Sequence, residues 1–398
     1  MSRINGVVGG VVRPVVRGLT SNKGVGGLRN NSRLIIDGDS ISTYAEPITD
    51  LILRTNGKLY LPAGYNQAVS GSTSADVVSR ISSVTSRSPK IVKLLIGTND
   101  LGITPDTPAV IFARIRQCVA AYRAAGARVL QHLILPRNDA AWLALSAGRR
   151  ADMAILNGLI ASQTDVILAD ATATFDPSTD TLDGLHPNWS GARKIAAAEA
   201  AKLNPLLSGA SLVTMYADAS NLGPSQSPDM SGTGGSAGTG VTGQVASNWG
   251  SAMGGGMLAT ARKVTIAAGP AAGLTAQEFE VSGTNSGSAN VCQLSQTITT
   301  TGTTGDEFDL WVYFELDAGH QNVQGPQIFG DTNGTPQAAR TLDGSQALSG
   351  VLRAPILTPL AAPDTSNAIF LRVYFAAGTV YAKFRWAARF LRKVPAGQ

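Results

Sequence analysis

The chain is poor in the residues that hold metal ions and disulfide frameworks. Its 398 residues include three histidines and two cysteines, Cys118 and Cys292, which fall in stretches of different character. Two distant cysteines cannot build the multi-bridge framework of a small secreted domain or a zinc site made of cysteines. We therefore expect no metal centre, and the sequence predicts no cofactor.

Long apolar runs are also missing. No stretch approaches the roughly 20 apolar residues of a membrane-spanning helix, so no membrane span is expected. The Gly/Val-rich start is interrupted at Arg13 and Pro14, and no A-x-A-like cleavage site follows, so no signal peptide is expected. Localisation stays open on these grounds, and an extracellular or a virion-associated protein would each be compatible with the sequence.

Charged residues make up only 15% of the chain, and the net charge of +5 is unevenly spread. Residues 1–206 contain 22 Lys and Arg against 15 Asp and Glu, whereas residues 207–398 contain 10 against 12. The basic side chains are scattered, without the basic runs and interleaved aromatic rings of a nucleic-acid surface. A solvated basic surface is the simpler explanation, so we expect no nucleic-acid partner.

Three zones follow one another along the chain. Residues 1–30 are rich in Gly, Val and Arg without helical or strand period, which indicates an extended arm or linker. Residues 31–206 alternate short apolar runs with amphipathic stretches, which predicts an α/β domain with a parallel sheet covered on both faces. Residues 207–398 show strand-like alternation, which predicts an all-β, jelly-roll-like sandwich. A homo-oligomer formed through the arm or the sandwich is left open.

Strands and helices are expected to alternate within residues 31–206. The strands are expected at Arg33–Asp37, Tyr65–Val69, Ile91–Gly97, Arg128–Leu133 and Val166–Ala169. The helices are expected at Pro47–Thr55, Ser74–Val84, Pro108–Ala125, Gly148–Gln163 and Ser190–Leu203.

Two runs in the last zone alternate apolar and polar residues. Phe308–Leu316 places every second side chain on one apolar face, and Val380–Phe390 does the same from its first residue to its last. Such alternation indicates one buried and one wet face. Trp311 and Tyr381 fall on the wet faces, where their rings would be candidates for stacking on sugars. Packing against the sandwich edge or a neighbouring chain is the alternative.

Polar residues collect after the expected strands of residues 31–206. Four blocks stand out, namely GDSI with Ser40, NQAVSGST with Gly71, GTND with Asn99, and DGLHP with Asp183 and His186. The carboxyl ends of parallel strands lie at one edge of a sheet, and that edge is where such sheets place their reactive groups. We therefore expect these loops to converge.

The residue types in these loops suit acyl transfer. A serine hydroxyl becomes a useful nucleophile when a neighbouring base takes its proton. Ser40 would be the nucleophile and His186 the base, with Asp183 orienting the imidazole. The backbone N–H groups of Ser40 and Gly71 and the side-chain amide of Asn99 could stabilise the oxyanion that forms.

The four blocks, in this order, resemble those of the SGNH hydrolases, also called the GDSL-like esterase or lipase family. The resemblance covers about residues 31–206, and Ala68 stands where many members have another glycine. It implies a flavodoxin-like three-layer sheet. It also implies the same catalytic residues and oxyanion donors that the residue types suggest.

The resemblance implies hydrolysis of carboxylic esters. Because an enzyme joined to a β-sandwich often acts on a polymer, deacetylation of a polysaccharide or glycan is the favoured reaction, by analogy of fold alone. Residues 207–398 would then be a carbohydrate-binding domain. The alternatives are a short-chain lipase or thioesterase of the same fold, and a phage-tail-type glycan-binding protein with accessory esterase activity.

Overall fold

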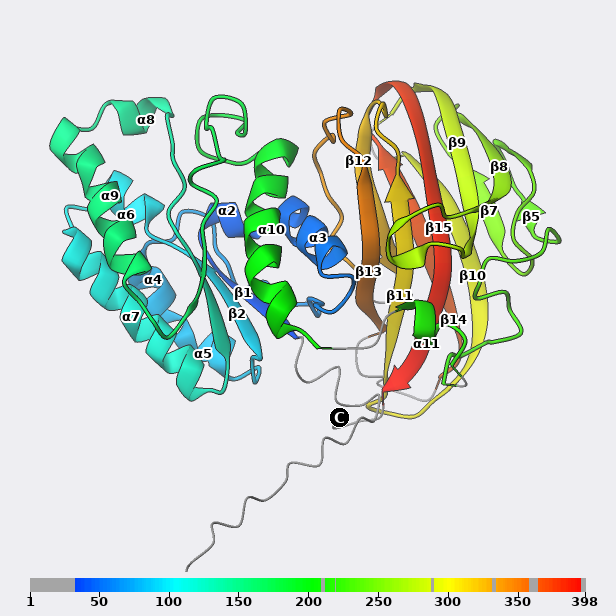
Figure 1. Cartoon of the computed structure of the whole chain (residues 1–398), viewed down its shortest axis with the longest axis horizontal. Coiled ribbons are helices and arrows are strands. Elements are labelled where there is room, and N and C mark those ends of the chain that lie inside the picture. Colours follow the sequence, from blue (N-terminus) through cyan, green and yellow to red (C-terminus); the bar gives the residue numbers. More distant parts are fainter. Residues whose placement is uncertain are drawn as a thin grey trace, which may run out of the picture.

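The structure is a computed structural model that describes residues 33–208, 212–218, 220–287, 290–330, 334–357 and 364–394. The expected arm at residues 1–30, with its expected oligomer contact, lies outside the described residues. Two parts lie side by side (Figure 1). Residues 33–208 are called the α/β region below, and residues 220–394 the β-sandwich.

The α/β region contains a parallel sheet of four strands in the order β1-β2-β3-β4. The strands are β1 Leu34–Gly38, β2 Ile91–Leu95, β3 Arg128–His132 and β4 Ile167–Ala169. The helices are α2 Ser40–Thr43, α3 Ala45–Arg54, α4 Ser74–Ser79, α5 Ile81–Thr85, α6 Thr98–Ile103, α7 Pro108–Ala124, α8 Ala140–Leu143, α9 Ala147–Ala161 and α10 Trp189–Leu203, followed by the 3-10 turn Asn204–Leu206.

The expected strand at Tyr65–Val69 is not a regular strand, and this expectation was wrong. The segment nevertheless runs alongside β1, because Ile36 N donates to Tyr65 O at 3.0 Å and Gln67 N donates to Ile36 O at 2.7 Å. With this segment counted as the second element, the spatial order is 2-1-3-4-5, which is the flavodoxin-like order. The expected fold class is confirmed.

Helices cover both faces of this sheet (Figure 1). The helices α4, α7 and α9 lie on the face away from the β-sandwich, and α3 and α10 lie on the face toward it. Side chains of β1 alternate accordingly, with Ile35 packed into the first layer and Leu34 and Ile36 into the second. Both faces of β1 are buried, which explains why Leu34–Ile36 reads as a continuous apolar run.

The expected helix at Ser74–Val84 is two short helices, α4 and α5, which meet at Arg80. The Arg80 guanidinium turns inward there and donates to Asp37 at 2.9 Å and to Gly38 O at 2.7 Å. The four other expected helices are confirmed to within two residues at each end.

The β-sandwich consists of two mostly antiparallel sheets, in the orders β12-β14-β10-β7-β5 and β13-β11-β15-β9-β8-β6. Consecutive strands from β9 to β15 alternate between the two sheets, which agrees with the expected jelly-roll-like sandwich. The strands are β5 Ser236–Ala237, β6 Val241–Gly243, β7 Gly250–Met253, β8 Leu258–Thr265, β9 Thr275–Asn285, β10 Asn290–Gly302, β11 Glu307–Leu316, β12 Val323–Phe329, β13 Leu348–Leu357, β14 Asp364–Phe375 and β15 Gly378–Val394. A short helix, α11 Leu212–Met215, precedes them, and a 3-10 turn lies at Gly269–Ala271.

Strand β11 is buried on both faces, against expectation. Its alternate apolar side chains point into the sandwich as predicted. On the other face, Trp311 is only 2% exposed, because α11 packs over it and the Arg353 guanidinium lies 4.4 Å from its ring centroid. The expectation that Trp311 is exposed was therefore wrong.

A bulge in β15 reverses the side-chain alternation near the end of that strand. The pairing with β11 leaves Ala388 as an extra residue, with a φ of 47°. One extra residue turns the side chains that follow it to the opposite face. Phe390 therefore packs beside Trp311 on the outer face, whereas the alternation had placed it inside the sandwich with Trp386.

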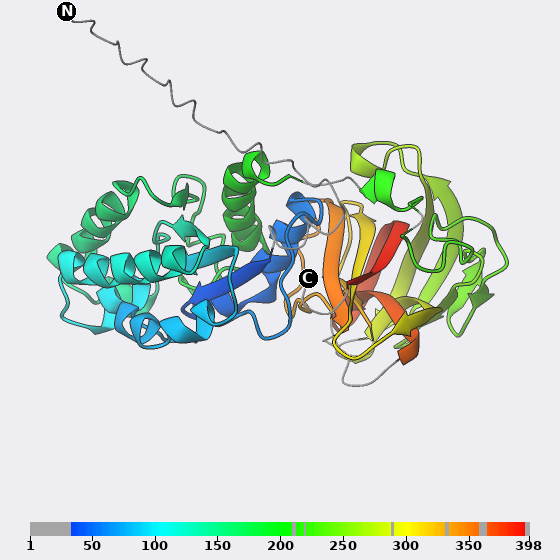
Figure 2. The same ribbon diagram turned by 90° about the horizontal axis from the view of Figure 1, so that it is seen from below.

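The two parts share a buried core. Leu53 of α3 and Trp189 of α10 belong to the same apolar cluster as the interior of the β-sandwich. Gly350 of β13 lies so close to α3 that an added Cβ would stand 2.3 Å from Leu53 O. Arg353 of the same strand reaches across, with its guanidinium 4.2 Å from the centroid of the Tyr60 ring. Figure 2 shows β13 (orange) alongside α3 (blue).

Candidate active site

Ser40 stands at the start of the short helix that follows β1. Gly38 ends that strand with a φ of 149°, and an added Cβ would lie 2.3 Å from Leu95 O, so glycine is required there. Asp39 then caps α2 by accepting a hydrogen bond from Ile41 N at 3.0 Å. This turn holds Ser40 at the carboxyl edge of the sheet, between β1 and the loop that follows β2.

Ser40, His186 and Asp183 form a hydrogen-bonded chain. Ser40 Oγ lies 2.9 Å from His186 Nε2, and His186 Nδ1 lies 2.7 Å from Asp183 Oδ2. The imidazole can thus take the serine proton on one nitrogen while the carboxylate holds the N–H of the other. The three side chains that sequence analysis selected for catalysis are therefore brought together, from loops far apart in the sequence.

Asp183 is held in place by its own loop. Its Oδ1 accepts hydrogen bonds from the backbone N–H groups of Leu185 at 3.0 Å and His186 at 2.7 Å. Partial burial acts to raise the pKa of Asp183, but the hydrogen bonds from the His186 side chain and from these N–H groups outweigh it and lower the pKa to about 2. The carboxylate therefore stays ionised near neutral pH and can balance a positive charge on the imidazole.

The expected oxyanion donors belong to the same loops. Asn99 is buried and donates one amide hydrogen to Ser72 O at 2.9 Å, which leaves its second amide hydrogen for another acceptor. Gly71 has a φ of 78°, and an added Cβ would meet no atom within 4 Å, so space is open beside its backbone. That these groups and the Ser40 N–H bind one oxyanion stays a prediction.

Hydrogen bonds and one ion pair that sequence analysis missed tie the loops together. Asp100 accepts hydrogen bonds from Ser74 N at 2.8 Å and Ser74 Oγ at 2.5 Å, which joins the loop after β2 to the start of α4. Arg80 donates to Ser72 Oγ at 2.8 Å while it pairs with Asp37. Asp100 could have been found from its place in the GTND block, whereas no motif surrounds Arg80.

Asp39 is a completely buried acid beside these contacts. Burial raises its pKa to about 7; the hydrogen bond from Ile41 N opposes this shift and the nearby Asp100 adds to it. Its Oδ2 has no hydrogen-bond partner among the described residues. Folding therefore favours the protonated form of Asp39, and stability should depend on pH through this group.

Tyr44 packs against the histidine, and Arg340 of the β-sandwich packs against Tyr44 in turn. Tyr44 packs its ring edge-on against His186, with centroids 5.8 Å apart and planes at 80°. The Arg340 guanidinium lies 3.5 Å from the centroid of the Tyr44 ring and donates a hydrogen bond to Pro187 O. Sequence analysis missed both residues, because Tyr44 stands outside the four blocks and Arg340 lies in a distant loop without any motif.

A cleft of about 230 Å³ opens next to this site, between the two parts of the molecule. Thr43 and Asn66 line it from the α/β region, and Pro336 lines it from the β-sandwich. Thr43 also donates a hydrogen bond to Ser40 O at 2.7 Å, so the cleft begins one helical turn from the serine.

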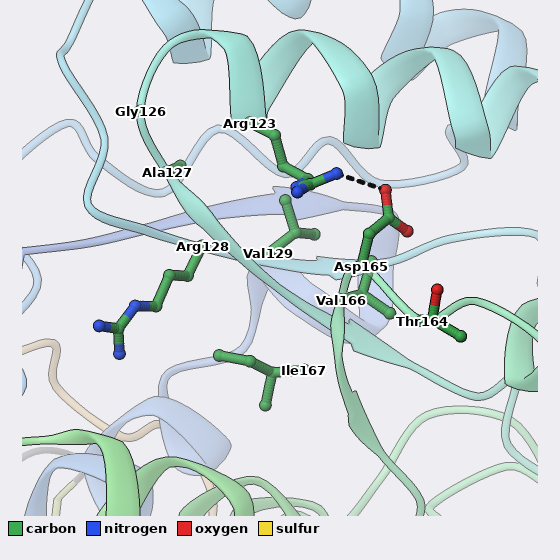
Figure 3. A pocket seen from close by; sticks show the side chains of 9 residues that line it. All are labelled: Arg123, Gly126, Ala127, Arg128, Val129, Thr164, Asp165, Val166 and Ile167. Atoms are coloured by element: carbon green, nitrogen blue, oxygen red, sulfur yellow. Dashed lines mark hydrogen bonds and ion pairs between the residues drawn. The ribbon is translucent and has the colours of Figure 1, made fainter. Parts of the chain in front are cut away.

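A hollow of about 430 Å³ lies at the opposite edge of the sheet, where β3 and β4 begin (Figure 3). Arg123 and Asp165 form an ion pair across it at 2.6 Å, and the Arg128 side chain points away from this pair. In parallel sheets ligands bind at the carboxyl ends of the strands, so this hollow is separate from the Ser40 site.

Other expectations can be placed on the described residues. They contain no group of three or more His, Cys, Asp or Glu side chains that could hold a metal ion. No helix in the described ranges is both long enough and apolar enough to cross a bilayer. Of the two aromatic rings considered for sugar stacking, Trp311 is buried and Tyr381 is 36% exposed.

Comparison with known proteins gives a family for the first part of the chain. Residues 38–194 match the model of the GDSL-like lipase/acylhydrolase family. A search of the curated proteins found no match.

Several solved structures are similar to part of this chain. A putative acylhydrolase from Bacteroides fragilis is 20% identical, with a TM-score of 0.38, covering 45% of this chain and 90% of that chain. A carbohydrate esterase family 3 protein from Talaromyces cellulolyticus is 23% identical, with a TM-score of 0.37, covering 44% and 98%. An acetylxylan esterase from Geobacillus stearothermophilus is 19% identical, with a TM-score of 0.36, covering 43% and 94%.

Proposed function

We propose that this chain, which carries a domain of the GDSL-like lipase/acylhydrolase (SGNH) family, is a serine esterase that acts through Ser40, His186 and Asp183. The observation that carries the proposal is the pair of hydrogen bonds that links these side chains, at 2.9 Å and 2.7 Å. A serine so placed can attack an ester carbonyl, because the base that must take its proton is already in contact with it.

In the acylation step, Ser40 Oγ forms a bond to the ester carbonyl carbon while its proton passes to His186 Nε2. The carbonyl oxygen becomes an oxyanion that accepts hydrogen bonds from the Ser40 and Gly71 N–H groups and from Asn99. Asp183 stabilises the imidazolium that has formed. The bond to the alcohol oxygen then breaks, the alcohol leaves with the proton from His186, and the acyl group stays on Ser40.

In the deacylation step, water replaces the alcohol. His186 takes a proton from the water as its oxygen attacks the acyl carbon, and the same donors stabilise a second oxyanion. The bond to Ser40 Oγ then breaks, the serine recovers its proton from His186, and the carboxylic acid is released. No cofactor takes part in either step of this proposal.

For the substrate we favour an acetyl ester on a polysaccharide or glycan. The cleft that begins at Thr43, one helical turn from Ser40, measures about 230 Å³, below the roughly 300–1,000 Å³ of sites for drug-sized ligands, so it has room for about one sugar ring of the substrate. The β-sandwich borders the same cleft and would hold the polymer. Tyr381 remains the proposed sugar-stacking ring, whereas Trp311 is withdrawn because it is buried.

An acyl-chain series tests this function. We expect kcat/KM to be highest for 4-nitrophenyl acetate and to fall at least about tenfold by the octanoate, a difference of about 1.4 kcal/mol, with acetate released from an acetylated polysaccharide. A maximum at the octanoate would overturn the acetylesterase proposal in favour of a lipase or thioesterase. Polymer binding without ester hydrolysis would overturn it in favour of a glycan-binding protein.

The control for this series is a pair of serines in one short helix. Ser40→Ala should abolish hydrolysis, whereas Ser42→Ala should keep it, because the buried Ser42 hydroxyl has no hydrogen-bond partner among the described residues. Activity that survives in Ser40→Ala would show that another nucleophile is used.

A further inference from the structure

We propose that Arg340, a residue of the β-sandwich, positions the catalytic histidine, so that the second part of the chain completes the active site of the first. This inference rests on the proposed function, since it gives His186 the role of base. Arg340 is thus a positioning residue, because it acts through Tyr44 and Pro187 and does not itself touch the reacting atoms.

The backbone of Arg340 is fixed by two side chains of the α/β region. Glu46 of α3, which is 1% exposed, accepts hydrogen bonds at Oε1 from Ala339 N at 3.1 Å and from Arg340 N at 3.0 Å. The Trp189 indole of α10 donates to Arg340 O at 2.6 Å. Both polar groups of the Arg340 main chain are therefore held by the α/β region, although the residue belongs to the loop between β12 and β13.

The side chain of Arg340 reaches the histidine by two routes. One route is the hydrogen bond to Pro187 O, which restrains the Pro187–Asn188 peptide, one residue beyond His186. The other is the stacking of the guanidinium on Tyr44, whose ring stands edge-on against the imidazole. A planar guanidinium can serve both contacts at once, because it stacks with its face and donates with its edge.

Position matters for this histidine because it must contact two partners at the same time. Its Nε2 has to meet Ser40 Oγ while its Nδ1 stays on Asp183, and rotation of the ring would break one of these contacts. Misplacing a reacting group by about 1 Å can cost around a hundredfold in rate. Loss of Arg340 frees both the Tyr44 ring and the Pro187 carbonyl, so we expect a fall in kcat with little change in KM.

The β-sandwich offers a matched control in Arg372. This residue is also half-buried and also stacks on an aromatic ring, with its guanidinium 4.4 Å from the Phe329 centroid. Its side chain donates to Gln293 at 2.6 Å, within the sandwich. Arg372→Ala therefore removes the same charge and a similar stacking contact from the same part of the molecule, away from His186.

The experiment compares full-length variants on 4-nitrophenyl acetate. Arg340→Ala should lower kcat about ten- to a hundredfold with KM within about twofold, and Arg340→Lys should recover part of the loss. Arg372→Ala should keep kcat within about twofold. The reaction of Ser40 with a fluorophosphonate should slow by the same factor in Arg340→Ala, because it also needs His186 to take the serine proton. Titrating active sites with that reagent gives the concentration of folded enzyme, so kcat is calculated for folded enzyme alone. If the alanine variant does not fold, Arg340→Met replaces it, because methionine keeps a long side chain without the guanidinium.

A double-mutant cycle with Tyr44→Ala tests the route. If both residues act on His186 together, the double variant should lose less than the product of the two single losses. Unchanged kcat in Arg340→Ala, a change confined to KM, or an equal loss in Arg372→Ala would overturn the inference. Ser40→Ala, measured in parallel, separates the two proposals. If the Ser40→Ala variant is active, the esterase mechanism itself is refuted. If Ser40→Ala is inactive and Arg340→Ala is fully active, only the role of Arg340 is refuted.

Discussion

Buried polar residues serve different ends in the two parts of the molecule. In the α/β region, Asp39 follows β1, next to Ser40 in the chain, and Asn99 and Asp100 follow β2, where they bond to the segment Ser72–Ser74. In the β-sandwich, Arg353 pairs with Asp309 at 2.8 Å between neighbouring strands, and its guanidinium faces the α/β region. In the α/β region such groups hold the loops beside Ser40 together, whereas in the β-sandwich this pair lies where one part of the molecule meets the other.

The largest effect should come from His186, the proposed base in the active site of the α/β region. His186→Ala should lower kcat at least about 10³-fold, because the serine loses its base, and Asp183→Asn should lose less, because the base remains. His320 is a buried histidine of the β-sandwich, 3% exposed, and His320→Ala should keep kcat within about twofold. Steady-state kinetics on 4-nitrophenyl acetate make the measurement. Similar losses in both alanine variants would remove the functional contrast between the two parts.

The next largest effect should be on stability, at the shared core. Trp189→Ala empties the space that this side chain fills between α10 and the β-sandwich, and it should lower the free energy of unfolding by about 3–5 kcal/mol. Urea unfolding followed by circular dichroism measures this change. A loss below about 1 kcal/mol would mean that the two parts do not depend on one another for stability.

The Asn99→Ala variant tests the catalytic role of a buried polar residue in the α/β region. It should lower kcat about 10²–10³-fold with little change in KM, because the amide acts mainly on the oxyanion. Asn157 supplies the control, since its side chain exchanges two hydrogen bonds with the backbone of Ile134 in the same region, at 2.8 Å and 2.9 Å. Asn157→Ala should lower the melting temperature and spare kcat. A rise in KM with kcat unchanged for Asn99→Ala would instead assign that residue to ground-state binding.

A smaller effect should follow from the buried acid next to the serine. The pKa of Asp39 is raised from 3.8 to about 7, so its contribution to stability is complete below about pH 4 and is lost as the pH rises through about 7. Asp39→Asn removes this dependence. The stability of the variant relative to wild type should therefore improve by about 2 kcal/mol between pH 5 and pH 8, measured by urea unfolding at both values. A constant difference between the two proteins would show that Asp39 does not titrate in this range.

The smallest effect should lie on the surface of the β-sandwich. Tyr381→Ala should raise KM for an acetylated polysaccharide about threefold, less than 1 kcal/mol, and leave 4-nitrophenyl acetate unaffected. Tyr381→Phe keeps the ring and should behave as wild type. Equal changes on the polymer and the small ester would mean that Tyr381 does not contact glycan.

The α/β region could be predicted well because apolar strands and polar loops follow one another in its sequence. Strands β1 and β2 are mostly apolar and each leads into a polar turn, so the sheet edge that carries Ser40 follows from the pattern. The distances among Ser40, His186 and Asp183 agree with the expected arrangement, while their catalytic roles stay predictions. Tyr65–Val69 failed as a strand because its hydrogen bonds to β1 are too few to make a regular ladder.

The β-sandwich could be predicted only in outline, because exposure depends on what covers a sheet. Trp311 alternates correctly with its core neighbours, yet α11 and Arg353 bury it from the other side. One extra residue at Ala388 moved Phe390 to that same face. Arg340 could not have been found from the sequence, since its partners Glu46 and Tyr44 meet it only in the folded chain.

The joint interior of Leu53, Trp189 and the sandwich constrains how this chain can evolve. Recombination near residue 207 would separate a tryptophan from the cavity that receives it and would leave the buried Glu46 carboxylate without its two N–H donors. A different sandwich could replace the present one only if it had a glycine at the position where Gly350 meets α3. It would also need a loop that packs around Trp189 and donates hydrogen bonds to Glu46. The two halves should therefore be inherited as a pair, and among descendants the residues at positions 46, 53, 189 and 350 should change together or not at all.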